Sequence, residues 1–246
     1  MSLDPTPLDS GLREAYESIT TATITTILLK KGLRNVWLRG TRPLRSCPSA
    51  YGGRLVGPAF TLRFVPARED LATPESWASP RSTRGAIEEM PEGCICVADA
   101  MGITAAGIFG DILCARMQVR KVTGLVTDGA VRDADGVNAT KLPVWCAAVA
   151  APPSVAGLTF VNWQEPIGCG GVAVFPGDTM VADNDGAVCV PKAMLEAVVK
   201  EAVEQEAFES WAADEVMKGA KLPGLYPPNE ETKARYAAFR EKNKSR

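Results

Sequence analysis

The 246-residue sequence predicts an α/β fold. Short apolar runs that are typical of buried strands occupy 94–100, 123–127 and 143–151. A loop and a segment with helical periodicity separate the first two runs, as in proteins that alternate strands with helices. Because 46% of the residues are hydrophobic, the chain can bury a large core. We therefore expect one domain over 1–218 and a C-terminal extension over 219–246.

The N-terminal part of the chain predicts two helices within 8–31. We expect the break between them in the threonine-rich run TTATITT, because β-branched side chains weaken a helix, and the end of the second helix at Gly32. Residues 33–53 form a basic loop, which is more typical of a solvated face or a subunit contact than of a phosphate site. Its arginines are Arg34, Arg39, Arg42 and Arg45.

Further strands are predicted at 54–65, where a Gly-Pro pair indicates a bulge, and at 158–162 and 170–178. Residues 66–92 are rich in proline and charge, and they contain a short helical pattern over 84–89. We interpret this segment as a surface excursion that lies near the functional site.

The last third of the chain predicts a hairpin and a long helix. Asn184-Asp185-Gly186 lies between two apolar runs within 181–191, which indicates a hairpin turn; its acidic residues do not complete a calcium loop. Pro191 is expected to begin a long helix that ends near Lys218. A proline-rich turn and a charged tail helix follow.

The composition argues against several classes of protein. A net charge of −2 gives no basic footprint, so we expect no nucleic-acid partner. The sequence has no apolar run that could span a bilayer and no signal-peptide pattern, so we expect a cytoplasmic protein with no membrane partner. The seven cysteines are odd in number and lie mostly in apolar runs, which favours reduced, buried thiols over reactive ones. Cys94 and Cys96 lack the spacing of a zinc knuckle.

The sequence contains no histidine. Ser-His-Asp and Cys-His catalysis and histidine-ligated zinc are therefore excluded. Acid–base chemistry would fall to carboxylates, Lys, Tyr, Cys or bound water. A metal would have oxygen ligands, which favours Mg²⁺ or Mn²⁺.

A turn followed by a helix forms the first half of the predicted site. Gly107 and Gly110 open the turn, and Asp111 occupies the position expected of a helix N-cap. The free amides of the first helical turn, at Ile112 and Leu113, are suited to binding a small carboxylate. The helix would pack through an apolar face made of Ile112, Leu113, Ala115, Met117 and Val119.

The second half of the site follows the strand at 123–127, because ligands gather at the carboxyl ends of such strands. Arg132 can clamp the same carboxylate through two hydrogen bonds, and Asp133 offers a hard oxygen to a divalent ion. Together these groups predict a site for a 2-oxo acid. Glycine-rich turns and Arg-Asp pairs also occur as purely structural features. Asp99, at the end of another strand, is a second candidate polar group.

The pattern G-x₃-D-x₂₀-R-D, from Gly107 to Asp133, resembles that of the class II pyruvate aldolases of the RraA-like group. These include 4-hydroxy-4-methyl-2-oxoglutarate aldolase and 4-carboxy-4-hydroxy-2-oxoadipate aldolase, which also decarboxylate oxaloacetate. The resemblance continues through IGCGGVAVFPGDTMVADNDGAVCVP and covers about 54–205. It implies a swivelling β/β/α domain and a homotrimer or a hexamer of two trimers, with sites between subunits. The family's cross-subunit glutamate would fall near Glu204 or Glu206.

The resemblance also implies roles for the site residues. Arg132 would bind the substrate and stabilise the pyruvate enolate, Asp133 would hold the metal, and Asp111 would orient the water that removes the proton of the C4 hydroxyl. The backbone cradle for the pyruvyl carboxylate would comprise Gly110, Asp111, Ile112 and Leu113. The expected reaction is retro-aldol cleavage of a 4-hydroxy-2-oxo acid to pyruvate.

Two alternatives remain open. Proteins of the same fold inhibit a ribonuclease; they lack the aspartate after the arginine, so Asp133 favours an enzyme over such a regulator. A Schiff-base mechanism would need a buried lysine, whereas Lys121 and Lys141 are predicted to lie on the surface. The segments 66–92 and 219–246 are longer than expected for a compact aldolase and could reshape the pocket.

Overall fold

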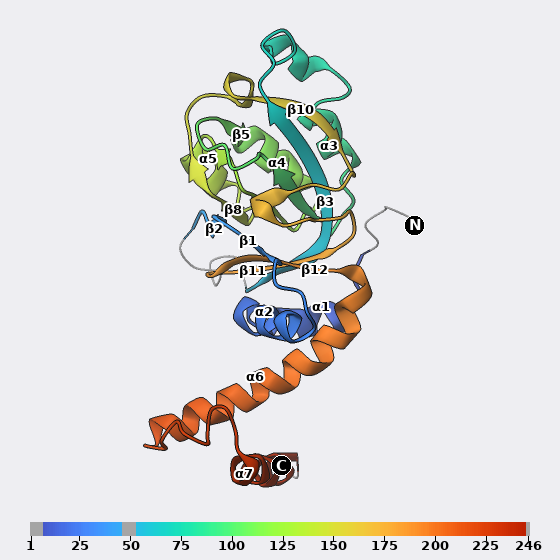
Figure 1. The fold of residues 1–246 in the computed structure, drawn as a ribbon. Coiled ribbons are helices and arrows are strands. Elements are labelled where there is room, and N and C mark those ends of the chain that lie inside the picture. Colours follow the sequence, from blue (N-terminus) through green and yellow to red (C-terminus); the bar gives the residue numbers. More distant parts are fainter. Residues whose placement is uncertain (1–6, 46–52, 245–246) are drawn as a thin grey trace.

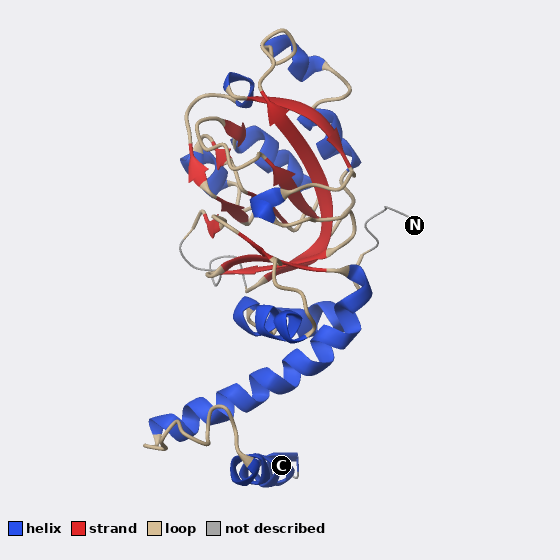
Figure 2. Ribbon diagram, in the orientation of Figure 1, coloured by secondary structure: helices blue, strands red, loops and turns tan. Residues whose placement is uncertain are grey.

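The computed structural model describes residues 7–45 and 53–244, and its strands form one large mixed sheet and one small parallel sheet (Figures 1 and 2). The large sheet contains β1 (Trp37–Leu38), β2 (Arg42–Pro43), β3 (Leu55–Pro66), β4 (Ile95–Asp99), β6 (Gly124–Thr127), β8 (Val144–Cys146), β10 (Leu158–Trp163), β11 (Thr179–Asp183) and β12 (Gly186–Val190). The small sheet contains β5 (Gly107–Phe109), β7 (Ala130–Val131) and β9 (Ala148–Val149).

The helices are α1 (Ser10–Glu17), α2 (Thr21–Lys30), α3 (Thr83–Glu89), α4 (Asp111–Val119), α5 (Ala134–Ala139), α6 (Leu195–Met217) and α7 (Glu230–Lys244). Short 3₁₀ turns are η2 (Pro74–Ala78), η3 (Ser154–Ala156), η4 (Cys169–Gly171) and η5 (Lys192–Met194). None of these helices is long and apolar enough to cross a membrane.

The long strand β3 joins the two halves of the large sheet, whose order is β1-β12-β11-β3-β4-β6-β8-β2, with β10 also paired to β3. Its first residues pair antiparallel with β11, and from Ala59 it pairs parallel with β4. The change of partner occurs at Gly57 and Pro58. A Cβ at Gly57 would lie 2.8 Å from the carbonyl oxygen of Gly93, so only glycine fits there. Figure 1 shows β3 curving between the two halves.

The small sheet extends the parallel part of the large one. Strands β4, β6 and β8 lie side by side and parallel. Each is followed in the chain by one strand of the small sheet, and β5, β7 and β9 pair parallel in the same order. The segments that leave the carboxyl ends of β5 and β7 are therefore neighbours, and these segments carry the predicted site residues.

Helices α1, α2 and α6 cover the β11–β12 side of the large sheet (Figure 1). Ile24 and Leu28 of α2 and Val198 of α6 are completely buried against Val181 and Val188. Beyond this contact α6 leaves the body of the protein (Figure 1). Its distal half packs with the C-terminal segment in a separate apolar cluster that comprises Phe208, Trp211, Ala212 and Leu225, with Tyr236 of α7 against it.

Three local predictions are wrong. The two predicted helices are present, but the threonine-rich run lies mostly within the second one instead of between them: α2 begins at Thr21, and Thr20 caps it by accepting a hydrogen bond from the Thr23 N–H. Residues 170–178 form no strand, because Gly170 and Gly171 take positive φ angles of 58° and 76° within η4. The long helix begins at Leu195, after η5, rather than at Pro191. The hairpin of β11 and β12 is confirmed.

Candidate functional site

The predicted site residues meet in one cavity of about 240 Å³. It lies beyond the carboxyl ends of β5 and β7, where the chain enters α4 and α5. The predicted residues that line it are Gly110, Asp111, Ile112, Leu113, Arg132 and Asp133. The remaining wall is made of Trp77, Thr83, Arg84, Gly107, Ile108, Pro153 and Ser154. This volume is below that of a typical drug-sized pocket and suits a small organic acid.

Helix α4 begins one residue earlier than predicted. Gly110 is its N-cap, with φ −118° and ψ −174°, and Asp111 is the first helical residue. Its Oδ1 accepts a hydrogen bond of 2.7 Å from the N–H of Ile112, so one of the amides that we expected to be free is engaged. The absence of a side chain at Gly110 matters, because a Cβ there would lie 2.8 Å from Oδ2 of Asp133.

Arg132 and Asp133 form an ion pair in which Arg132 Nε lies 3.1 Å from Asp133 Oδ2. Their side chains keep 36% and 47% of their accessible surface, so both remain available to a ligand. The backbone N–H of Arg132 donates to the carbonyl of Phe109, which ties the two strand ends together. A Cβ at Gly107 would lie 2.7 Å from the Cβ of Arg132, so this glycine permits the close approach.

The first turns of α4 and α5 also converge on the cavity. Asp133 is the N-cap of α5 and adopts the left-handed conformation, with φ 52° and ψ 47°. A Cβ at Gly136, in the first part of α5, would lie 2.7 Å from the Cβ of Asp111. Glycine at this position therefore lets α5 pack against Asp111 and fixes the spacing of the two carboxylates.

The predicted apolar face of α4 is confirmed at Met117, which is buried, and at Leu113, which packs partly buried against the core, but it is wrong at Ile112, Ala115 and Val119. Only Cys114 and Met117 of this helix are buried, whereas Ile112 and Val119 are 78% and 71% exposed. Positions 114 and 117 lie one turn apart, so α4 packs through a narrow stripe and presents other apolar side chains to the surface.

Asp99 has a structural role, and so does Asp128, which sequence reasoning did not single out. Asp99 accepts hydrogen bonds from the N–H groups of Met101 and Gly168. Asp128 accepts them from Ala100, Gly102 and Gly170. Burial raises the pKa of Asp128, although its three backbone donors act against this shift. These carboxylates tie the loop that follows β4 to the segment around η4.

The thiols and lysines behave as predicted within the described part of the chain. Cys94, Cys96, Cys114, Cys146, Cys169 and Cys189 are free and buried, while Cys47 lies outside the described residues. Burial raises the pKa of the Cys114 thiol, the one nearest to the site in sequence, to about 12, so it is not a ready nucleophile. Lys121 and Lys141 are both exposed.

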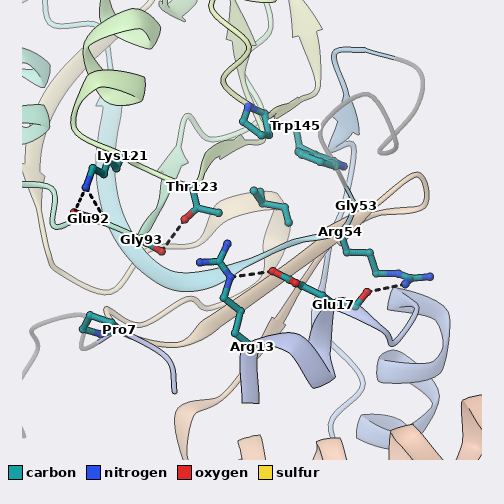
Figure 3. Close-up of a pocket in the computed structure, with 12 residues that line it drawn as sticks. Pro7, Arg13, Glu17, Gly53, Arg54, Glu92, Gly93, Lys121, Thr123 and Trp145 are labelled. Atoms are coloured by element: carbon teal, nitrogen blue, oxygen red, sulfur yellow. Dashed lines mark hydrogen bonds and ion pairs between the residues drawn. The ribbon is translucent and has the colours of Figure 1, made fainter. Parts of the chain in front are cut away.

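A larger cavity, of about 880 Å³, lies at the other end of the parallel strands and is shown in Figure 3. It is lined by residues that precede β4, β6 and β8, and by α1. Its charged groups have partners within the chain: Arg13 pairs with Glu17, Lys121 pairs with Glu92, and Arg54 donates to the carbonyl of Glu17 and lies near Asp183. The site chemistry predicted from the sequence is not found there.

The matched residues decide the family. The profile of the RraA-like family, described as Aldolase/RraA, matches residues 21–189, which is most of the chain and includes all the predicted site residues. The chain belongs to the RraA-like family. The α/β fold, with its N-terminal helices and its long C-terminal helix and tail, is confirmed.

Individual relatives are similar to this RraA-like chain at modest identity. A protein of Halalkalibacterium halodurans, named "Putative 4-hydroxy-4-methyl-2-oxoglutarate aldolase", is 32% identical over 169 residues, which are 67% of this chain and 74% of that protein. Protein DlpA of Legionella pneumophila is 27% identical over 175 residues. These cover 71% of this chain but only 28% of DlpA, so the chain spans about a quarter of that relative's length.

Solved structures of similar proteins have the same fold. Streptomyces coelicolor RraAS2, described as an unusual member of the RNase ES inhibitor RraA protein family, is 31% identical, with a TM-score of 0.74. The match covers 85% of this chain and 98% of RraAS2. An uncharacterized protein from Pseudomonas syringae pv. tomato shares the fold with a TM-score of 0.75 at 24% identity.

Proposed function

We propose that this RraA-like protein is a divalent-metal-dependent carbon–carbon lyase. It cleaves 4-hydroxy-2-oxo acids by a retro-aldol reaction that releases pyruvate, and it decarboxylates oxaloacetate through the same pyruvate enolate. The observation that carries this proposal is the meeting of Arg132, Asp133 and the start of α4 in one small cavity. The aldolase names of the family and of the Halalkalibacterium relative support it.

The side chains at this cavity fit a weakly coordinated hard cation. The described residues contain no group of three or more His, Cys, Asp or Glu side chains placed to hold a metal, so a tightly caged ion is not supported. Asp133 instead offers one half-exposed carboxylate, and Gly110 leaves open the space that a Cβ would fill beside it. Mg²⁺ accepts such a site because it keeps several waters, and Mn²⁺ takes similar oxygen ligands. When bound, the ion would polarise the 2-keto oxygen of the substrate.

The chain's own residues would supply the remaining chemistry. The amides at the start of α4 other than that of Ile112, which Asp111 engages, bind the pyruvyl carboxylate, helped by the helix dipole. Arg132 donates to the substrate and stabilises the charge that develops on the enolate. Asp111, whose Oδ1 is held by the Ile112 amide, orients the water that accepts the C4 hydroxyl proton in the retro-aldol reaction. Decarboxylation needs no such proton transfer.

We also propose that the protein works in the cytoplasm as a homotrimer or as a hexamer of two trimers, with the site near a subunit contact. The unpaired thiols of the described cysteines support a reducing compartment. Glu204 and Glu206, proposed near the position of a cross-subunit glutamate, are engaged within their own chain in this structure. Glu204 pairs with Arg240, and Glu206 accepts hydrogen bonds from Thr20.

Pyruvate release tests the proposal. Oxaloacetate and 4-hydroxy-4-methyl-2-oxoglutarate are supplied with Mg²⁺, with Mn²⁺ and with EDTA, and pyruvate is measured through lactate dehydrogenase. We expect turnover of both substrates that EDTA abolishes and added metal restores. Borohydride trapping with pyruvate should leave the protein unmodified; a covalent adduct would instead establish a Schiff-base mechanism.

The second candidate is a non-catalytic, trimeric RraA-type regulator of a ribonuclease. The similarity to RraAS2 favours it, since that protein is described within an inhibitor family. Asp133 favours the enzyme. Inactivity on several 4-hydroxy-2-oxo acids and on oxaloacetate, combined with inhibition of a ribonuclease, would select the regulator.

A further inference from the structure

Arg84 is a second cation at the candidate site, and nothing in the proposed reaction uses it. It is the second residue of α3 and lines the same cavity as Arg132 and Asp133. The other charged residues of α3 have partners: Glu88 pairs with Arg116 and Arg120, and Glu89 accepts a hydrogen bond from the Trp163 indole. Arg84 forms no ion pair with any residue that the structure describes.

The position of Arg84 is firmly fixed. Its neighbours Thr83, Ala86 and Ile87 are buried. A Cβ at Gly85 would lie 2.1 Å from the carbonyl oxygen of Pro80, so only a glycine lets the preceding turn close over the start of α3. The backbone that carries Arg84 is therefore part of a rigid, well-packed segment rather than a free loop.

The side chain of Arg84 is oriented as well. Its guanidinium carbon lies 5.2 Å from the centre of the Trp77 ring, and Trp77 also lines the cavity. A cation–π contact of this kind restricts the position of a guanidinium and uses none of its N–H donors, which stay available to bind a planar anion. A carboxylate is the natural ligand for these donors because it can accept two parallel hydrogen bonds.

The charge balance of the cavity points to the same ligand. The charged side chains of its wall are Arg84, Arg132, Asp111 and Asp133, which sum to zero. A bound divalent cation would leave two positive charges, which a dianion neutralises. Without Arg84 the balance would suit a monoanion.

We propose that Arg84, held by its cation–π contact with Trp77, is a specificity-determining residue that binds a second carboxylate of the substrate and so selects dicarboxylic over monocarboxylic 2-oxo acids. This inference rests on the proposed function, since Arg132 and the start of α4 must hold the carboxylate beside the keto group. The proposal also explains the long excursion 66–92, because this segment supplies both Trp77 and Arg84 to the wall of the site.

Equilibrium binding separates this role from catalysis. The probes are 2-oxoglutarate and 2-oxopentanoate, which have the same chain length, differ in the terminal carboxylate, and cannot undergo the retro-aldol or decarboxylation reactions. Their dissociation constants are measured by calorimetry with Mg²⁺ present. We expect Arg84→Met to weaken binding of 2-oxoglutarate by about ten- to a hundredfold and to change binding of 2-oxopentanoate by less than about twofold. Arg84→Lys should restore part of the loss.

Matched variants complete the experiment. Arg81→Met removes an exposed arginine of the same segment that does not line this cavity, and it should leave both dissociation constants unchanged. Trp77→Leu should weaken the binding of 2-oxoglutarate but not that of 2-oxopentanoate, and Trp77→Phe should weaken the binding of 2-oxoglutarate less than Trp77→Leu does. In turnover, Arg84→Met should lower kcat/KM for 4-hydroxy-2-oxoglutarate and spare 4-hydroxy-2-oxopentanoate.

The possible failures are distinguishable. Equal weakening of both probes by Arg84→Met would mean that Arg84 serves the shared carboxylate or the fold, and would overturn the inference. Unchanged dissociation constants for both probes in Arg84→Met would also overturn it. In that case turnover by the wild-type protein would still support the proposed function. If the wild-type protein neither binds the probes nor releases pyruvate from any substrate, the proposed function fails and the inference fails with it.

Discussion

At the scale of single residues, Asp133 is notable for its backbone conformation, which is left-handed. Its left-handed conformation is unfavourable for most side chains and is typical of positions where function imposes strain. It caps α5 without a hydrogen bond from its side chain, so the carboxylate contributes nothing to the cap. The carboxylate pairs with Arg132 and keeps 47% of its accessible surface, so it is open to a ligand.

The conformation of Asp133 allows chemistry and stability to be separated. Glycine adopts the left-handed region without strain. In Asp133→Gly this relief of strain in the folded state offsets the extra conformational entropy that glycine gives the unfolded chain. We expect Asp133→Gly to unfold within about 1 kcal/mol of wild type in urea and to lose metal-dependent pyruvate release. Asp135→Gly is the control, because Asp135 is exposed and does not line the cavity. Activity retained in Asp133→Gly would remove Asp133 from the metal site.

Asp111 yields a test of the reaction step. Asparagine keeps an oxygen that can accept the hydrogen bond from Ile112 but cannot orient a proton-accepting water in the same way. We expect Asp111→Asn to slow retro-aldol cleavage by about 10²-fold and oxaloacetate decarboxylation much less, because only cleavage requires the C4 hydroxyl proton to leave. Both rates are measured on one preparation. Equal losses would show that Asp111 positions the substrate instead.

At the scale of elements, the contact between α6 and α2 predicts a pH dependence. Glu206 Oε1 accepts hydrogen bonds of 2.7 Å from both the N–H and the hydroxyl of Thr20, the N-cap of α2. Burial acts to raise the pKa of Glu206, but these hydrogen bonds outweigh it and the pKa is lowered from 4.5. A carboxyl with a lowered pKa in the folded state stabilises the protein above its ordinary pKa and loses this effect as the pH falls.

Glu206→Gln should therefore lower the free energy of unfolding at neutral pH by about 0.5 to 1 kcal/mol. This loss is small for a hydrogen-bonded charged group, because the side chain is half-buried and screened by solvent. The difference in unfolding free energy between the variant and the wild type should vanish as the pH falls through the lowered pKa of Glu206. Urea unfolding across acidic and neutral pH measures it. Glu204→Gln, which removes an exposed pair with Arg240, should have little effect at any pH. A loss that grows at acidic pH would contradict the sign of the predicted shift.

Sequence periodicity predicted the buried strands well, because alternating and continuous apolar runs directly reflect burial. It failed where local glycine geometry overrides hydrophobicity, as in 170–178. The pattern of residues also predicted which site groups would meet. It did not predict Trp77 and Arg84, because their place at the site depends on how the excursion folds back over the small sheet. The sequence did indicate that the excursion 66–92 lies near the site, but it did not indicate which of its side chains would reach the cavity.

At the scale of the whole molecule, α4 indicates how subunits meet. Ile112 and Val119 lie two turns apart on one face of the helix and are 78% and 71% exposed. Ile112 also lines the cavity, so this stripe begins at the site and extends along α4 past Ala115 and Arg116 to Val119. An exposed apolar stripe that is continuous with a functional site is typical of a surface covered by another subunit. We expect this stripe to lie in the contact of the proposed homotrimer.

Val119→Glu tests this contact without touching the cavity, because Val119 does not line it. Light scattering should give the wild-type protein three or six times the chain mass of 26.2 kDa, and the variant a smaller assembly with reduced pyruvate release. A charge buried without a partner at a subunit contact costs several kcal/mol, which is enough to dissociate it. Gln118→Glu places the same charge on an adjacent exposed residue that points away from the stripe, and it should preserve the assembly. An unchanged mass for Val119→Glu would place the subunit contact elsewhere.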